Sequence, residues 1–204
     1  MKVYIDFDGT LFDTDKYNKN TKEVFNKYGI TNEMFHEAYQ ELFGKTKLFN
    51  LNIIADYLVD KYSIDKEIYK EISVVKNNDY VYPEVINCLK EMNLLGFELY
   101  ILTYGDILFQ REKIEYSNIS KYFKDIIITE QTKTSLNLDF KNIIFIDNNP
   151  NETEMFHNVG SKCVIRIKRS TDKYSELKNN TKEVLEFEDF NKIVDYMKGN
   201  IKNG

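Results

Sequence analysis

The segment VYIDFDGT, residues 3–10, joins a short apolar run to two aspartates and a glycine. The run Val3–Phe7 has the β-branched and aromatic composition of a strand buried on both faces. Asp6 and Asp8 are two positions apart, so on a continuing strand both side chains would lie on one face. Gly9 permits a bend and lets backbone N–H groups approach an anion. The segment therefore predicts a strand that ends in a turn rich in carboxylates.

Similar apolar runs recur along the chain and alternate with helical patterns from residue 83 onward. Further strands are expected at Phe97–Leu102, Ile126–Ile128, Ile143–Ile146 and Cys163–Ile167. Helices are expected from Pro83 to just before Gly96, after Asp106, from Pro150 with Asn149 as its cap, and over Asp189–Met197. This alternation predicts an α/β fold with an open, parallel sheet.

The stretch between the first two strands has helical periodicity instead. Two apolar stripes recur at helical spacing, one at Phe35, Ala38, Tyr39, Leu42 and Phe43 and one at Ile64, Ile68, Ile72 and Val75. An all-helical insert of this size is too long for a loop. We therefore expect two domains: an α/β core formed by residues 1–14 and 80–204, and a small helical domain formed by residues 15–79.

The composition excludes several classes of protein. The 204 residues are 42% hydrophobic and 30% charged, with no apolar run of the roughly 20 residues that a membrane helix needs. Acids at positions 6 and 8 interrupt the first apolar run too early for a signal peptide, and a formal net charge of -5 argues against a nucleic-acid-binding protein. Cys88 and Cys163 are expected to be buried thiols in a reducing compartment. We expect a cytoplasmic protein without a membrane or nucleic-acid partner, and its oligomeric state is left open.

Polar side chains follow three of the expected strands. Asp6 and Asp8 end the first strand, Thr103 ends the second, and Asp147 follows the run Ile143–Ile146. Ligands of open α/β sheets bind at the carboxyl ends of the strands, and carboxylates gathered there require a compensating cation. Mg²⁺ fits, because it binds one or two carboxylates together with water and a substrate phosphate. The pattern predicts phosphoryl transfer, in which one carboxylate attacks phosphorus and its neighbour transfers the proton.

Three ordered motifs resemble those of the haloacid dehalogenase-like (HAD) superfamily of hydrolases. They are DFDGTLFD at residues 6–13, ILT at 101–103 and IFIDNNP at 144–150. The remaining motif of the superfamily is a lysine ahead of the last one. Lys133 matches it best, with Lys113 and Lys141 as the alternatives. The resemblance implies a three-layer, Rossmann-like core, and it identifies the helical insert as the cap that these enzymes carry between their first two motifs.

The resemblance also implies a role for each matching residue. Asp6 would be the nucleophile and Asp8 the general acid and base. The carboxylates of Asp6 and Asp147 and the backbone carbonyl of Asp8 would hold Mg²⁺, while Thr103 and Lys133 would bind the phosphoryl oxygens. The dehalogenase branch lacks an acid at the position of Asp8, so its presence favours phosphate chemistry.

The expected function is that of a Mg²⁺-dependent phosphatase acting on a small phosphorylated metabolite through an aspartyl phosphate. A phosphomutase of the same superfamily is one alternative, because it uses the same residues and differs only in the acceptor. A non-catalytic module that binds phosphate or a partner is another. Two departures from the family pattern concern the outer ligands of the metal. Asn148 stands where many relatives carry an acid, and Asn151 replaces another acid, with Glu152 beside it.

Overall fold

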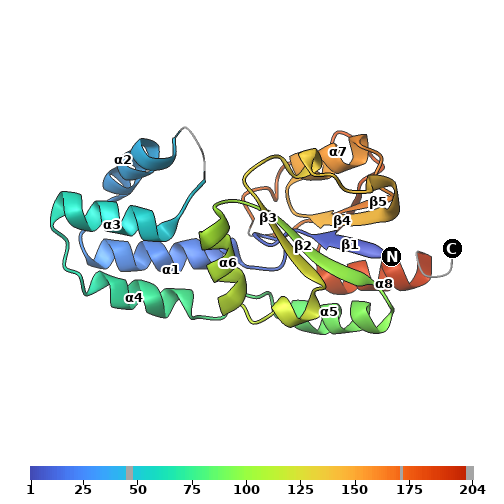
Figure 1. Cartoon of the computed structure of the whole chain (residues 1–204), viewed down its shortest axis with the longest axis horizontal. Helices are drawn as coiled ribbons and strands as arrows, with labels where there is room; N and C mark the ends of the chain where they lie inside the picture. Colours follow the sequence, from blue (N-terminus) through green and yellow to red (C-terminus); the bar gives the residue numbers. More distant parts are fainter. Residues whose placement is uncertain (45–47, 171, 201–204) are drawn as a thin grey trace.

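The computed structural model describes residues 1–44, 48–170 and 172–200. They form a layered α/β part, which carries both the first and the last of the described residues, and a group of helices beside it (Figure 1). The chain leaves the α/β part after its first strand and returns to it after the group of helices. This path is the one that the sequence predicts.

A parallel sheet of six strands forms the centre of the α/β part in the described residues. The strands lie in the order β3-β2-β1-β4-β5-β6, and every neighbouring pair is parallel. Their bounds are β1 Lys2–Ile5, β2 Glu98–Tyr104, β3 Asp125–Thr129, β4 Ile143–Asp147, β5 Cys163–Ile167 and β6 Leu185–Phe187. Ile5 is in register with Ile101 and with Ile146. The three central strands therefore bring their carboxyl ends to the same edge, and the α/β fold class is confirmed.

Helices cover both faces of this sheet. Helices α5 (Val85–Leu94) and α8 (Phe190–Asn200) lie on one face, and α7 (Pro150–Asn158) lies on the other (Figure 1). On the α7 side, Phe156 stacks on Phe145 of β4 with ring centroids 3.5 Å apart. The remaining helices of this part are α6 Ile107–Tyr116 and the short 3-10 helices η1 Ser120–Tyr122, η2 Lys133–Ser135 and η3 Phe140–Asn142.

A helical cap follows β1. It consists of α1 Thr14–Lys27, α2 Asn32–Phe43, α3 Leu51–Tyr62 and α4 Ile68–Lys76. Three of these helices begin with a side-chain cap, because Asp13, Thr31 and Asn50 each accept a hydrogen bond from a backbone N–H of the first turn. Aromatic rings connect the cap to the α/β part, where Phe49 meets Phe109 of α6 edge-on at 5.5 Å between centroids. The helical cap is thus present beside the carboxyl edge of the sheet.

Strand boundaries differ from the sequence prediction near this edge. β1 ends at Ile5 rather than at Phe7, because the chain turns: the carbonyl of Phe7 accepts the N–H groups of Leu11 and Phe12, each at 3.0 Å. β2 continues to Tyr104. The sequence prediction lacks β6, which is an edge strand of three residues that pairs only with β5 and has no buried apolar run.

Helix boundaries differ in three places. The last helix, α8, runs over Phe190–Asn200 instead of Asp189–Met197. α5 begins at Val85, and Pro83 lies in a preceding turn that the Val85 N–H closes by donating to the Tyr82 carbonyl at 3.0 Å. Ile64 precedes α4 instead of belonging to it. The division into domains at residues 14–15 and 79–80 stays a prediction.

The two cysteines and the lengths of the helices bear on the expected compartment. Cys88 is buried and Cys163 is half-buried rather than buried, and both are free thiols. Within the described ranges, no helix has both the length and the apolar composition needed to cross a bilayer.

Candidate active site

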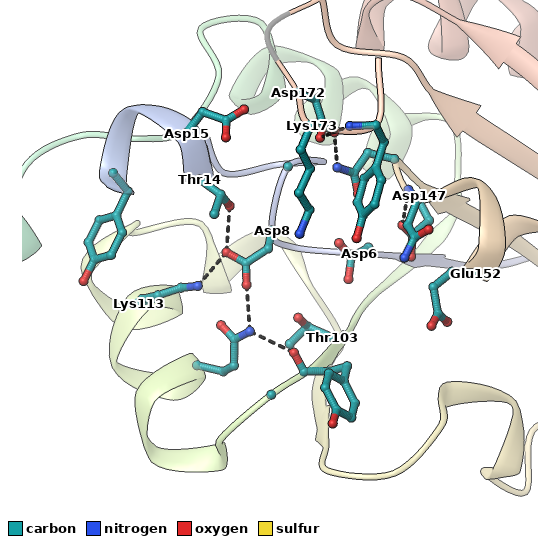
Figure 2. Close-up of a pocket in the computed structure, with 18 of the residues that line it drawn as sticks. Asp6, Asp8, Thr14, Asp15, Thr103, Lys113, Asp147, Glu152, Asp172 and Lys173 are labelled. Atoms are coloured by element: carbon teal, nitrogen blue, oxygen red, sulfur yellow. Dashed lines mark hydrogen bonds and ion pairs between the residues drawn. The ribbon is translucent and has the colours of Figure 1, made fainter. Parts of the chain in front are cut away.

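A cavity of about 360 Å³ opens at the carboxyl ends of β1, β2 and β4 (Figure 2). Its lining includes all the residues that the sequence singles out for catalysis and metal binding: Asp6, Asp8, Thr103, Lys133 and Asp147. Side chains from the cap, from α6 and from the segment between β5 and β6 complete the lining. The structure therefore brings the predicted site residues together.

Lys133 joins two buried carboxylates of this cavity. Its Nζ donates to Oδ1 of Asp6 at 2.6 Å and to Oδ2 of Asp147 at 2.7 Å. The lysine begins the short helix η2 and is buried. Lys141 is exposed and precedes β4, at the opposite edge of the sheet, so it does not reach these carboxylates.

Burial and mutual repulsion set the charges of this cluster. The pKa of Asp6 is raised to about 7, first by burial and then by the charge of Asp147, with Lys133 acting against both. Burial also raises the pKa of Asp147, again against Lys133. Burial disfavours the charge of Lys133, but the two carboxylates outweigh that effect and its pKa is raised. A single ammonium between two buried carboxylates leaves the cluster short of positive charge.

Asp8 has a different set of partners and lies partly exposed. Its carboxylate accepts hydrogen bonds from three side chains: Lys113 at 2.5 Å, Gln110 at 2.7 Å and Thr14 at 2.8 Å (Figure 2). Burial alone would raise the pKa of Asp8, but Lys113 and the other donors outweigh it, so the pKa is lowered. Asp8 is held as a carboxylate. Because β1 ends before Asp6, the two aspartates do not share the face of a continuing strand, and each pairs with its own lysine.

The hydroxyl of Thr103 has no hydrogen-bond partner among the described residues. Thr103 lies near the carboxyl end of β2, is 1% exposed and lines the cavity. A buried polar group without a partner costs about 1–3 kcal/mol. An acceptor bound in the cavity would remove this cost, so Thr103 marks a position suited to an anion.

Gly9 allows the loop after β1 to approach the end of β4. Its φ is +73°, and a Cβ at this position would collide with the side-chain amide of Asn148. That amide donates to the carboxylate of Asp172, and the backbone N–H of Asn148 donates to Oγ1 of Thr10 at 3.0 Å. Asn148, at a position where an acid is frequent in the family, thus contacts a carboxylate from a distant segment.

The cavity also contains residues that the sequence prediction leaves out: Thr14, Gln110, Asp172 and Lys173. Lys113, an alternative to Lys133, pairs with Asp8 instead of Asp6. Gln110 and Lys113 lie on one face of α6, four and seven residues after its cap Asp106. Helical spacing predicts this shared face, but not that the face meets Asp8. The segment between β5 and β6 has no periodicity, and no sequence pattern points to its residues.

The donor set at this edge fits a hard divalent cation. Asp6 and Asp147 both reach the Nζ of Lys133, so their carboxylates can face one common position. One carboxylate oxygen of Glu152, which lines the same cavity, is buried without a hydrogen-bond partner in the described chain. Carboxylate and carbonyl oxygens are the ligands that Mg²⁺ prefers. No group of three or more His, Cys, Asp or Glu side chains has metal-binding geometry within the described residues. The backbone carbonyl of Asp8 as a further metal ligand stays a prediction.

A sequence model of haloacid dehalogenase-like hydrolases matches residues 3–136. The chain belongs to the haloacid dehalogenase-like hydrolase family. As a member of this family it is a hydrolase, and the resemblance found in the motifs is confirmed. A curated relative, the glyceraldehyde 3-phosphate phosphatase of Pyrococcus abyssi, is 28% identical over 141 residues. The matched stretch covers 63% of this chain and spans only 59% of the relative.

Solved structures of the family share the whole fold. A haloacid dehalogenase-like hydrolase from Burkholderia xenovorans has a TM-score of 0.76 at 17% identity, covering 97% of this chain and 96% of its own. A HAD phosphatase from Thermococcus onnurineus has a TM-score of 0.66 at 17% identity, with coverage of 98% and 99%. The HAD hydrolase YfnB from Bacillus subtilis, bound to magnesium, has a TM-score of 0.60 at 17% identity, with coverage of 98% for both chains. At these identities the likeness concerns the fold alone.

Proposed function

We propose that this hydrolase is a Mg²⁺-dependent phosphatase that acts on a small phosphorylated metabolite through an aspartyl phosphate at Asp6. The observation that carries the proposal is the meeting of Asp6, Lys133 and Thr103 in one cavity, where a carboxylate lies beside a buried ammonium and an unpartnered hydroxyl. The carboxylate can attack phosphorus, and the two donors can bind phosphoryl oxygens. The curated relative from Pyrococcus abyssi, a phosphatase, supports the same class of reaction.

In this proposal Asp6, Asp147 and the backbone carbonyl of Asp8 hold Mg²⁺. When bound, Mg²⁺ offsets the negative charge that the carboxylates and the phosphoryl oxygens bring together. The shortage of positive charge around the two buried carboxylates supports this assignment. The solved Bacillus subtilis relative, which is bound to magnesium, also supports it.

Asp6 and Asp8 divide the chemistry. An oxygen of Asp6 bonds to phosphorus while the bond from phosphorus to the leaving oxygen breaks, and Asp8 gives that oxygen a proton. Water then attacks the phosphorus, Asp8 takes the proton of the water, and inorganic phosphate leaves as the Asp6 carboxylate is restored. Lys113 holds Asp8 in the ionised state that the second step needs. The first step needs the protonated acid, so the contact between Lys113 and Asp8 has to loosen when substrate binds.

The size of the cavity favours a small substrate. A volume of about 360 Å³ suits a metabolite. The proposal includes no nucleic-acid or membrane partner. It places the enzyme in the cytoplasm, where two free thiols are stable.

Phosphate release from an aryl phosphate, and then from a panel of phosphorylated metabolites, tests the proposal. The wild type is expected to release phosphate with Mg²⁺ and to lose this activity in EDTA. Asp6→Asn is expected to lower the rate by several orders of magnitude with an unchanged circular dichroism spectrum. Dependence on a bisphosphate activator with little phosphate released would identify a phosphomutase instead. A wild type that hydrolyses no member of the panel contradicts the proposal.

A further inference from the structure

We propose that Lys173 is a phosphate-binding residue of this site, in addition to Thr103 and Lys133; the proposal rests on the phosphatase function proposed above. Lys173 belongs to the segment between β5 and β6, which no motif of the sequence analysis includes. It lines the same cavity as Asp6 and Asp8. Figure 2 shows its side chain extending into the site, with the ammonium ending between these two aspartates in this view.

Lys173 differs from the other lysines of the cavity in its partners. Lys113 is paired with Asp8, and Lys133 is paired with both Asp6 and Asp147. Lys173 forms no ion pair with any residue that the structure describes, and its ammonium lies 4.7 Å from the centroid of the neighbouring tyrosine ring. Its charge is therefore available to an incoming anion.

The balance of charge favours this use of Lys173. Among the described residues, the cavity is lined by six acidic side chains and three lysines: Asp6, Asp8, Asp15, Asp147, Glu152 and Asp172 against Lys113, Lys133 and Lys173. A phosphoryl dianion adds further negative charge to this surplus. An ammonium that no carboxylate occupies can move onto the phosphoryl oxygens without first breaking an ion pair. Lysine commonly binds phosphate in this way, as a point charge.

The backbone on both sides of Lys173 is fixed to the α/β core. The carboxylate of Asp172 accepts from the side-chain amide of Asn148 and, at 2.9 Å, from the backbone N–H of Tyr174. The carbonyl of Tyr174 accepts from the buried Arg166 at 2.7 Å. These contacts hold the start of the Lys173 side chain over the cavity, so little backbone freedom is lost when the ammonium meets a ligand.

Binding of inorganic phosphate, measured by calorimetry in Mg²⁺ alongside aryl phosphate kinetics, tests the role of Lys173. Lys173→Met is expected to weaken phosphate binding, and to raise KM, on the order of 10- to 100-fold, as for a lost charge-assisted hydrogen bond. The melting temperature should change little, because the side chain is exposed and, among the described residues, contacts the ring of Tyr174 but forms no ion pair. Lys173→Arg should restore most of the binding. Lys178→Met removes an exposed lysine of the same segment that does not line the cavity, and it should leave binding and KM as in the wild type.

The outcomes separate this proposal from the phosphatase proposal. Equal phosphate binding by Lys173→Met and the wild type overturns the role of Lys173, whether or not the enzyme turns over phosphate esters. Weaker binding by Lys173→Met in a protein that hydrolyses no ester supports the role of Lys173 and overturns the phosphatase function. A wild type that neither binds phosphate nor hydrolyses an ester overturns both. A loss of binding that Lys173→Arg does not restore, together with a lower melting temperature, assigns Lys173 a structural role and overturns the proposal.

Discussion

Lys113 and Asp8 form an ion pair in which Nζ lies 2.5 Å from Oδ1, although 105 residues separate them in the chain. Lys113 is nearly buried, and its charge helps to hold the pKa of Asp8 below its ordinary value. We predict that Lys113→Met raises the pKa of Asp8. Because an aryl leaving group needs little help from a proton donor, the pH profile of kcat with an aryl phosphate reports Asp8 as the base. The acidic limb of this profile should therefore move to higher pH in Lys113→Met.

Steady-state kcat across the range from about pH 4 to 8 measures this shift. Lys121→Met, which removes an exposed lysine of η1 outside the cavity, is the matched control and should leave the limb in place. An acidic limb that does not move in Lys113→Met would show that Lys113 does not set the protonation of Asp8.

The unpartnered hydroxyl of Thr103 should lower the stability of the free protein and contribute to phosphate binding, and both effects can be measured. Thr103→Val keeps the shape of the side chain and removes a buried hydroxyl that has no partner in the described chain. We predict that kcat/KM falls about 100-fold, as for the loss of one donor to a developing charge. The melting temperature should stay the same or rise, because an unsatisfied polar group is removed. Thr103→Ser, which keeps the hydroxyl, should retain most of the activity. Full activity of Thr103→Val would exclude Thr103 from phosphoryl binding.

Asp6 should destabilise the metal-free protein at neutral and basic pH. Its pKa in the folded state is raised to about 7, whereas an unfolded aspartate has a pKa near 4. The folded protein therefore binds a proton between these values that the unfolded chain has released. The stability that this proton contributes is present below about pH 4 and is lost as the pH rises to about 7.

Asp6→Asn removes this titration, so in EDTA its melting temperature should exceed that of the wild type at about pH 8, by more than at about pH 5. Thermal unfolding in EDTA at both pH values measures the difference. Asp139→Asn, at an exposed position, is the control and should show no such dependence on pH. A metal-free Asp6→Asn variant that is less stable than the wild type at the higher pH contradicts this prediction.

Magnesium should stabilise the folded protein through Asp147. A ligand that binds only the folded state raises the melting temperature. Once its concentration exceeds Kd, the stabilisation grows with the logarithm of the ratio of concentration to Kd. We predict a rise for the wild type in Mg²⁺ and a much smaller one for Asp147→Asn. Asp125→Asn, at an exposed position at the start of β3, should respond like the wild type. An undiminished response of Asp147→Asn would remove this residue from the metal site.

The parts of the fold that sequence predicts are those with local signals. The run Cys163–Ile167, which is apolar except for Arg166, gives the bounds of β5. The side chain of Asn149 accepts from the Asn151 N–H at the start of α7, as its position before Pro150 indicates. Gly96 lies just past α5 with a φ of +84°, as the end of a helix requires. The edge strand β6 is not predicted from the sequence, because its extended conformation depends on its pairing with β5 and not on a local pattern.

In the candidate site too, residues with a local sequence signal are predictable and residues placed by distant contacts are not. Asp6, Thr103 and Asp147 are predictable because each follows a strong strand signal, and the parallel register then brings them together. The contact of Asp8 with Lys113 joins the loop after β1 to a helix, and only the packing of α6 determines it. Lys173 lies in an irregular segment whose path depends on distant contacts, so no local pattern could have placed it at the cavity.

Detection of a phosphorylated Asp6 tests the central claim most directly. Asp8→Asn should still allow Asp6 to attack an aryl phosphate, but it should slow the attack of water on the intermediate about 100- to 10,000-fold. We predict that acid quenching in Mg²⁺ traps an acyl phosphate, and that borohydride reduction with mass spectrometry finds homoserine at position 6 and none in the double variant Asp6→Asn, Asp8→Asn. Homoserine at another aspartate, or phosphate release by Asp8→Asn without any modified residue, would contradict Asp6 as the nucleophile.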